Sequence, residues 1–212
     1  MRNALLAAGA GLLIFVLGIW LVLGSKGGTS RSEAELAALQ RPHAALVGNP
    51  EAKVTIVEFL DPACETCREF YPLVKGLLKD NPGRIRLAIR LVPFHPNSDI
   101  AVKALEAAKL QDKFWPVLEQ LLATQSRWVQ NHRVDPDALM AQLRTVDADF
   151  AKLQTDMQSP DVAKNVALDL GDAKTLKVTA TPEYFVNGRG LPDFGWDQLR
   201  GLVSNELARA YP

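Results

Sequence analysis

The two cysteines of the chain, Cys64 and Cys67, lie three positions apart in the stretch DPACETCREFYP. The residues before them, Val54 to Leu60 (VTIVEFL), are nearly all apolar and include β-branched and aromatic types, which predicts a strand covered on both faces. The residues after them repeat apolar positions at helical spacing to about Lys79 and end at NPG (81–83), which predicts a helix. The cysteine pair therefore stands where a buried strand turns into a helix.

Three kinds of site could use such a pair. A disulfide within so short a loop would contribute only about 2 kcal/mol, and a chain of 212 residues with 48% hydrophobic residues can build a core without it. A zinc site would need further ligands from His43, His95 or His132, none of which has ligand spacing. A reactive centre uses every feature, because the helix start stabilises a thiolate at Cys64 and places Cys67 to displace a mixed disulfide. We favour the reactive centre and expect neither a metal nor a cofactor.

The N-terminal segment predicts a membrane anchor. Residues 4–24 carry no charge and are long enough, at about 1.5 Å per residue, to cross the roughly 30 Å hydrocarbon layer. LGSKGGTSRS follows without an A-x-A-like cleavage site, so we expect residues 1–24 to stay as one transmembrane helix, with a removed signal peptide or a core helix as alternatives. Residues 25–45 are predicted to be a linker. Lys and Arg total 24, as do Asp and Glu, which gives no reason to expect nucleic acid as a partner.

The remaining chain, residues 46–212, is predicted to be one domain. RIRLAIRLVP (84–93) alternates in polarity, which predicts a second strand with one face less buried. Residues from about 97 to 176 contain several helical patterns and no convincing strand, which indicates an inserted helical block. A strand around Tyr184 to Val186, an Asn187-Gly188 turn typical of a hairpin, and a helix over residues 196–210 close the chain.

This order resembles the thioredoxin superfamily and, within it, the DsbA-like bacterial disulfide oxidoreductases, over roughly Pro50 to Tyr211. The residues that carry the resemblance are the C-x-x-C pair at a helix start, the Thr-Pro before a late strand and hairpin, and the helical insertion between them. The resemblance implies an α/β thioredoxin-like fold with an inserted helical subdomain. It implies that Cys64 is the exposed nucleophile and Cys67 the buried resolving cysteine.

The resemblance also implies roles for four further residues. Pro72 would interrupt and kink the helix, and Thr181-Pro182 would form a cis peptide bond beside the sulfurs, with the Thr181 backbone pairing with substrate. Glu58 would be the buried acid that moves the proton of the second cysteine. On the residues alone, Thr181-Pro182 could be an ordinary strand start, and Glu58 could face solvent on an edge strand. If Glu58 is buried, we expect a raised pKa and access to water.

Glu65 and Thr66, between the cysteines, bear on the direction of electron flow. They differ from the Pro-His, Gly-Pro and Gly-His pairs of this superfamily, and a glutamate beside the sulfur should disfavour the Cys64 thiolate and make the disulfide less oxidising.

We therefore predict a thiol–disulfide oxidoreductase that acts on protein thiols and disulfides, as a reductase or isomerase rather than a primary oxidase, and that a partner protein resets. Residues 4–24 would tether it to the inner membrane with the domain in the periplasm. Two alternatives remain open. One is a module that delivers copper or another thiophilic metal through Cys64 and Cys67, and the other is a purely structural envelope domain.

Overall fold

A computed structural model of the chain describes residues 31–212. The predicted transmembrane anchor, residues 4–24, lies outside the described residues. Within the described part, no helix is both long enough and apolar enough to cross a bilayer. The compact unit runs from Glu33 to Pro212, so it begins earlier than residue 46. It includes residues 33–45, for which we expected a linker.

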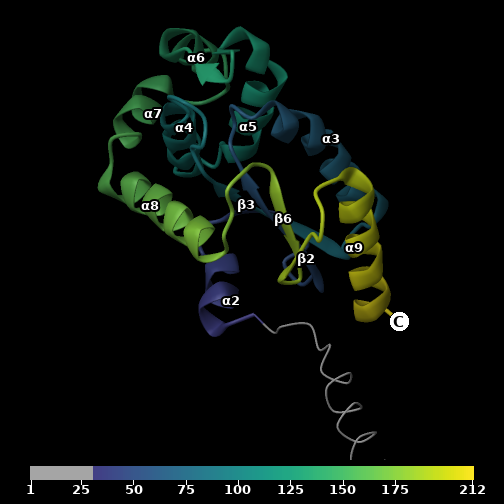
Figure 1. The fold of residues 1–212 in the computed structure, drawn as a ribbon. Coiled ribbons are helices and arrows are strands. Elements are labelled where there is room, and N and C mark those ends of the chain that lie inside the picture. The colour runs from purple at the N-terminus through teal and green to yellow at the C-terminus, as the bar shows by residue number, and fades with distance from the viewer. Residues whose placement is uncertain (1–30) are drawn as a thin grey trace, which may run out of the picture. The chain divides into compact units, whose positions relative to one another are not determined.

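Five strands form the central sheet (Figure 1). Their order is β1-β3-β2-β6-β7, in which β2 and β3 are parallel and the other neighbours are antiparallel. The predicted strand VTIVEFL is confirmed as β2, and its central place in the sheet explains why it is apolar on both faces. The strands are β1 (Ala45–Gly48), β2 (Val54–Leu60), β3 (Ile85–Leu91), β6 (Glu183–Val186) and β7 (Arg189–Gly190).

Helices cover both faces of this sheet. Val54, Ile56 and Leu60 of β2 belong to the core cluster that contains the buried residues of α3 (Glu65–Asp80) and α9 (Trp196–Ala210). Val57 and Phe59, which point the other way, belong to the cluster that contains α2 (Glu33–Leu39) and the end of α8 (Pro160–Thr175). The alternation of side chains along one strand thus separates the two cores.

Helix α3 begins directly after Cys64 and buries one side chain on each of its first three turns. Cys67, Tyr71 and Val74 are buried along one face at helical spacing. We expected Pro72 to interrupt this helix, but the helix continues through Pro72 to Asp80. Burial of Tyr71 and Val74 on either side of the proline holds that turn against the sheet.

The helical block lies between β3 and β6, as predicted. It comprises α4 (Asp99–Lys109), α5 (Phe114–Ala123), the 3-10 turn η1 (Gln125–Arg127), α6 (Pro136–Leu143), α7 (Phe150–Asp156) and α8. The expectation that it has no strand is wrong. It contains a hairpin of β4 (Val129–Gln130) and β5 (Arg133–Val134), strands of two residues that are too short to show an alternating pattern.

Strand β3 is more deeply buried than its alternation suggested. Ala88 and Arg90 lie on the face that we expected to be less buried, yet Arg90 is 0% exposed. Its guanidinium donates to Asp169 at 2.7 Å, to Asp172 at 2.5 Å and to the carbonyl oxygen of Ala38 at 2.5 Å. These bonds connect β3 to α8 and α2, which cover this face, and they satisfy a charge that would otherwise be costly to bury.

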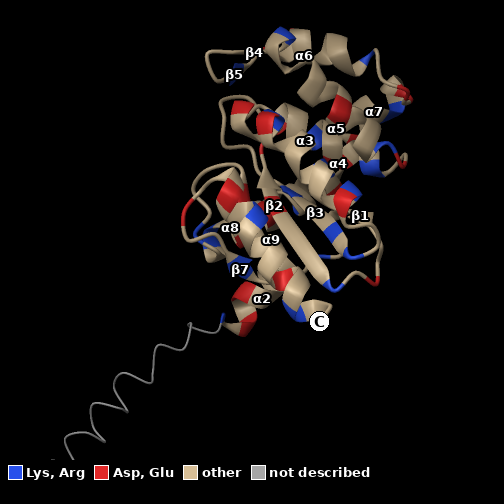
Figure 2. Cartoon of the chain, turned by 90° about the vertical axis from the view of Figure 1, so that its right-hand side faces the viewer, with Lys and Arg blue, Asp and Glu red and all other residues tan. Residues whose placement is uncertain are grey.

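Charged residues of both signs are interspersed along the helices of the described part (Figure 2). This agrees with the equal totals of 24 basic and 24 acidic residues in the whole chain. Such a mixed surface gives no single-sign field that would steer a strongly charged macromolecule toward it.

Candidate active site

Cys64 lies at the junction between β2 and α3, where it is the N-cap residue of the helix. Its Sγ is 3.1 Å from the carbonyl oxygen of Thr181, to which the thiol donates. The expectation that Cys64 is exposed is wrong, because the Thr181-Pro182 loop lies against its sulfur and only 5% of the residue is exposed. Cys67 lies one turn further along α3 and is 0% exposed. Both cysteines are free thiols in this structure. The structure therefore brings the predicted nucleophile, the predicted resolving cysteine and the Thr181-Pro182 loop together.

The Cys64 thiol has a pKa lowered to about 6. The main cause is a hydrogen bond from the Cys67 thiol, while burial acts in the opposite direction. The backbone amide of Cys67 and the positive charge of His95 lower the pKa further. Burial and the bond to Cys64 raise the pKa of Cys67 well above its ordinary value. At neutral pH the site thus pairs a thiolate at Cys64 with a protonated thiol at Cys67.

Asp61 organises the turn that leads to Cys64. Its carboxylate is fully buried and accepts hydrogen bonds from the amide of Ala63 at 2.9 Å and from the hydroxyl of Ser98 at 2.9 Å. It also lies 2.8 Å from Nδ1 of His95, whose pKa it raises. The sequence does not mark Asp61 as a site residue, because an Asp-Pro pair after a strand indicates only a turn.

Gln125 holds the same turn from the helical insertion. Its side-chain amide donates to the carbonyl oxygens of Pro62 and Cys64, both at 2.9 Å. Gln125 is 1% exposed, and its Oε1 has no partner among the described residues. No sequence signal marks this residue, since the contact spans more than 60 positions along the chain.

Glu65 is not among the groups that shift the pKa of Cys64, so its expected effect on the thiolate stays a prediction. The Glu65 carboxylate points to His132, with Oε2 at 3.1 Å from Nδ1. Burial raises the pKa of Glu65, but its own backbone amide and His132 outweigh this and lower it. His95 lowers the pKa of both Glu65 and Cys64. Thr66, the other residue between the cysteines, is partly exposed.

Glu58 lies in the middle of β2 and is 0% exposed, so the edge-strand alternative does not hold. Its Oε1 accepts a hydrogen bond from the Tyr184 hydroxyl at 3.1 Å, and its Oε2 has no partner among the described residues. Burial raises the pKa of Glu58 to about 8, and the charge of Cys64 adds to the shift. The charge of Glu58 in turn raises the pKa of Cys67, so ionisation of one of these two groups disfavours ionisation of the other.

The Thr181-Pro182 peptide bond is cis, as the resemblance implied. Pro182 directly precedes β6, and the Thr181 carbonyl faces the Cys64 thiol. The Thr181 hydroxyl is buried beside this sulfur and helps to lower the pKa of Cys64. The loop therefore borders the reactive sulfur with backbone atoms.

Aromatic side chains surround Phe70, which lies one turn after Cys67 in α3. Phe70 stacks on Tyr184, with ring centroids 6.1 Å apart, and lies 4.9 Å from Phe194 and 6.5 Å from Trp196. Phe194 is 52% exposed. These residues form an aromatic surface that joins α3 to the segment before α9.

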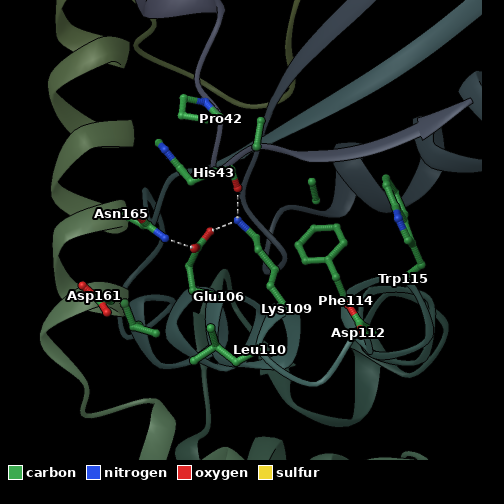
Figure 3. A pocket seen from close by; sticks show the side chains of 13 residues that line it. Pro42, His43, Glu106, Lys109, Leu110, Asp112, Phe114, Trp115, Asp161 and Asn165 are labelled. Atoms are coloured by element: carbon green, nitrogen blue, oxygen red, sulfur yellow. Dashed lines mark hydrogen bonds and ion pairs between the residues drawn. The ribbon is translucent and has the colours of Figure 1, made fainter. Parts of the chain in front are cut away.

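A separate pocket of about 420 Å³ lies between α4, α8 and the segment that leads into β1 (Figure 3). Its charged groups bond to one another, because Lys109 pairs with Glu106 and donates to the His43 carbonyl at 2.8 Å, and Asn165 donates to Glu106 at 3.0 Å. None of the residues described above for the cysteine site lines this pocket. It is therefore not part of the cysteine site.

Residues 40–205 match the protein family described as Thioredoxin. The chain is 31% identical over 144 residues to the Na⁺/H⁺ antiporter NhaA of Herminiimonas arsenicoxydans, but this match covers 68% of the chain and only 22% of that protein. The chain thus spans about a fifth of the length of the first antiporters it matches.

Two further proteins match over most of their own length. The chain is 29% identical over 172 residues to the probable disulfide bond formation protein D of Bacillus cereus, which covers 77% of this chain and 78% of that protein. The structure of the present chain is similar to the crystal structure of a thioredoxin-like oxidoreductase from Silicibacter pomeroyi DSS-3, with a TM-score of 0.71 and 27% identity. The match covers 85% of this chain and 99% of that one.

Proposed function

The chain belongs to the thioredoxin family, and from that premise we propose that it is a thiol–disulfide oxidoreductase that exchanges disulfides with protein substrates through Cys64 and Cys67. The observation that carries this proposal is the placement of Cys64 at the N-terminus of α3, beside the Thr181-Pro182 loop, with the buried thiol of Cys67 one turn away; the lowered pKa of Cys64 and the raised pKa of Cys67 agree with it. The names of two similar proteins, a thioredoxin-like oxidoreductase and a disulfide bond formation protein, support the same reaction class.

In the reducing direction, the Cys64 thiolate attacks one sulfur of a substrate disulfide. A new bond joins Cys64 to that sulfur, and the other substrate sulfur leaves as a thiolate. Cys67 then loses its proton and attacks Cys64, which forms the Cys64–Cys67 disulfide and releases the second substrate thiolate. Two electrons pass from the enzyme to the substrate, and the reverse sequence oxidises a substrate dithiol.

Glu58 is the group that we propose accepts the proton of Cys67. A carboxyl with a pKa of about 8 can exchange a proton near neutral pH, where a general base is most effective. The unpartnered Oε2 of Glu58 leaves room for a proton path through a water molecule. Glu58 thus acts on the second step, in which the buried thiol must ionise.

Substrate binding falls to the surface around the reactive sulfur. The Thr181 backbone beside the cis bond offers hydrogen bonds to an extended segment, and the aromatic surface around Phe70 and Phe194 offers apolar contact. Both features suit an unfolded or extended protein chain.

The lowered pKa of Cys64 bears on the direction of exchange. The value of about 6 lies between about 7 for thioredoxin and about 3.5 for the strong oxidant DsbA. A less stabilised thiolate makes the disulfide a weaker oxidant, so we propose action as a reductase or isomerase that a partner protein resets. We further propose that residues 4–24 anchor the domain at the periplasmic side of the inner membrane.

A redox titration of the Cys64/Cys67 couple against glutathione tests the direction. A midpoint near −270 mV, about that of thioredoxin, supports a reductase, and one near −120 mV, about that of DsbA, contradicts the assignment. Reduction of insulin by dithiothreitol tests the activity, with Cys64→Ser as the inactive control. Tight stoichiometric copper without turnover would contradict the oxidoreductase and favour metal delivery. Membrane fractionation of the full chain and protease access in spheroplasts test the location.

A further inference from the structure

Three side chains that can bind metals meet beside Cys64, although they come from distant parts of the sequence. Glu65 is the first residue of α3, His95 follows β3, and His132 is in the turn of the β4–β5 hairpin. One potential ligand atom from each residue lies within 4.8 Å of the others. Oε2 of Glu65 is 3.1 Å from Nδ1 of His132, and the two histidine rings have centroids 6.3 Å apart.

The turn between β4 and β5 places His132 beside Glu65 and His95. Asn131 and His132 both have positive φ angles, 51° and 60°, which is the conformation of a type I′ turn between two short strands. His132 has 75% of its side chain exposed. An ion from solvent can therefore reach the cluster without any opening of the core.

A buried carboxylate orients the second histidine. Oδ2 of Asp61 lies 2.8 Å from Nδ1 of His95, and Asp61 is itself fully buried and fixed by the hydroxyl of Ser98. Histidines that bind metals commonly donate the other ring N–H to a carboxylate in this way, which fixes the tautomer and makes the free nitrogen a better ligand. Nε2 of His95 is then the nitrogen available to a cation.

We infer that Glu65, His95 and His132 form a binding site for Zn²⁺ or a divalent transition metal of similar preference. Two imidazole nitrogens and one carboxylate oxygen are ligands that Zn²⁺ accepts, and three protein ligands leave a fourth position open. Ligands of a tetrahedral zinc ion lie roughly 3.3–3.5 Å apart. The side chain of His132 is exposed and can move the short distance that brings the three ligand atoms this close together.

The site differs from metal binding by the cysteines, because it needs neither thiol. Its effect on exchange rests on the proposed function. Glu65 adjoins Cys64 in the chain, and His95 is bonded to Asp61, whose backbone carbonyl oxygen accepts a hydrogen bond from the Cys64 amide at 3.0 Å. A cation held by these side chains would stand in the approach of a substrate to Cys64. Zn²⁺ should therefore slow exchange, while the binding itself does not depend on any activity.

The test uses the full chain oxidised to its Cys64–Cys67 disulfide, so that no thiolate can hold the metal. Zn²⁺ is titrated in competition with a chromophoric chelator, and we expect one ion per chain. His132→Ala and Glu65→Gln should each lower the affinity at least about tenfold, in line with the cost of losing groups that support metal sites. Glu69→Gln, at an exposed position of the same helix, is the matched control and should bind as the parent protein does.

Each outcome decides the inference. It is overturned if the oxidised protein binds no Zn²⁺, if it binds as tightly after His132→Ala, or if only the reduced protein binds, since the cysteines would then be the ligands. Because His132 is exposed, loss of folding is not expected, and circular dichroism verifies this. Zn²⁺ binding by a protein that fails to reduce insulin would support the site and contradict the proposed function, so the two are separable.

Discussion

The Tyr184 hydroxyl donates a hydrogen bond to Oε1 of Glu58, and the two oxygens lie 3.1 Å apart. The two residues are direct partners in the antiparallel pairing of β2 with β6, and both are 0% exposed. The register of the sheet, rather than any local sequence preference, thus gives the buried acid its single donor. One bond does not replace the lost hydration of a carboxylate, which is why the pKa of Glu58 rises to about 8.

Replacing Glu58 by glutamine should change how stability depends on pH. With a pKa of about 8 in the folded state and near 4.5 in the unfolded state, folded Glu58 keeps a proton that the unfolded chain releases. Stability of the reduced parent protein therefore falls as pH rises through this window. Glu58→Gln lacks this titration, so its free energy of unfolding should gain about 3–5 kcal/mol on the parent between pH 4.5 and pH 9.

Urea unfolding at several pH values measures this difference. Glu119→Gln is the matched control, because Glu119 is bonded to Lys75 near the surface and has a lowered pKa. That variant should lack the gain of Glu58→Gln at high pH. Parallel pH curves for Glu58→Gln and the parent protein would contradict the raised pKa.

Alkylation should separate the two cysteines by pH. The Cys64 thiol, with a pKa of about 6, should reach half of its maximal rate with iodoacetamide near pH 6. Cys67 should stay unlabelled because its pKa is raised and it is 0% exposed, whereas 5% of Cys64 is exposed. Mass spectrometry of the labelled peptides from pH 4 to pH 9 measures both rates. In urea both thiols should titrate near pH 8.5. Equal labelling of the two cysteines in the folded protein would contradict the assignment.

Removing the buried guanidinium of Arg90 should destabilise the fold strongly. Arg90→Met leaves Asp169 and Asp172 without their shared cation, and loss of one partner of a buried ion pair costs about 3–5 kcal/mol. Urea unfolding measures the loss. Lys79→Met, at an exposed position near the end of α3, should change the free energy of unfolding by less than about 0.5 kcal/mol. Similar values for the two variants would mean that the buried pair contributes nothing.

Local sequence patterns predict those helices, strands and turns whose formation depends on neighbouring residues in the chain. The strand 54–60, the Asn187-Gly188 hairpin and the helix 196–210 were predicted correctly, since each has its own periodicity or turn residues. Strand β1 was missed because only Ala45 of its four residues is buried, so no alternation marks it. The burial of Arg90 was missed because it depends on α2 and α8, which a single strand pattern cannot reveal.

The same limit applies to the candidate site. Cys64 and Cys67 could be identified because their spacing and their place at a helix start are local features of the sequence, whereas the role of Glu58 was implied only by the family resemblance. Gln125 and His132 could not, because the insertion brings them to the cysteines from more than 60 positions away. The contact between Glu65 and His132 could not be predicted for the same reason.

Gln125 should control both the stability of the cysteine turn and the reactivity of Cys64. Its amide donates to the carbonyl oxygens of Pro62 and Cys64 from a buried position. Gln125→Leu removes both donors, so we expect a loss of about 1–3 kcal/mol in the free energy of unfolding. The turn that positions Sγ should relax, and alkylation of Cys64 at pH 7 should slow several-fold.

Gln120→Leu is the matched control, because Gln120 makes one side-chain bond of 3.3 Å near the surface of the same insertion. It should leave both the stability and the alkylation rate close to those of the parent protein. The pH profile of Cys64 alkylation shows whether Gln125 only packs or also positions the sulfur. If Gln125 only filled space, Gln125→Leu would lower stability and leave that profile unchanged. A shifted profile with Gln125→Leu, and an unshifted one with Gln120→Leu, is the result expected if the insertion positions the reactive sulfur.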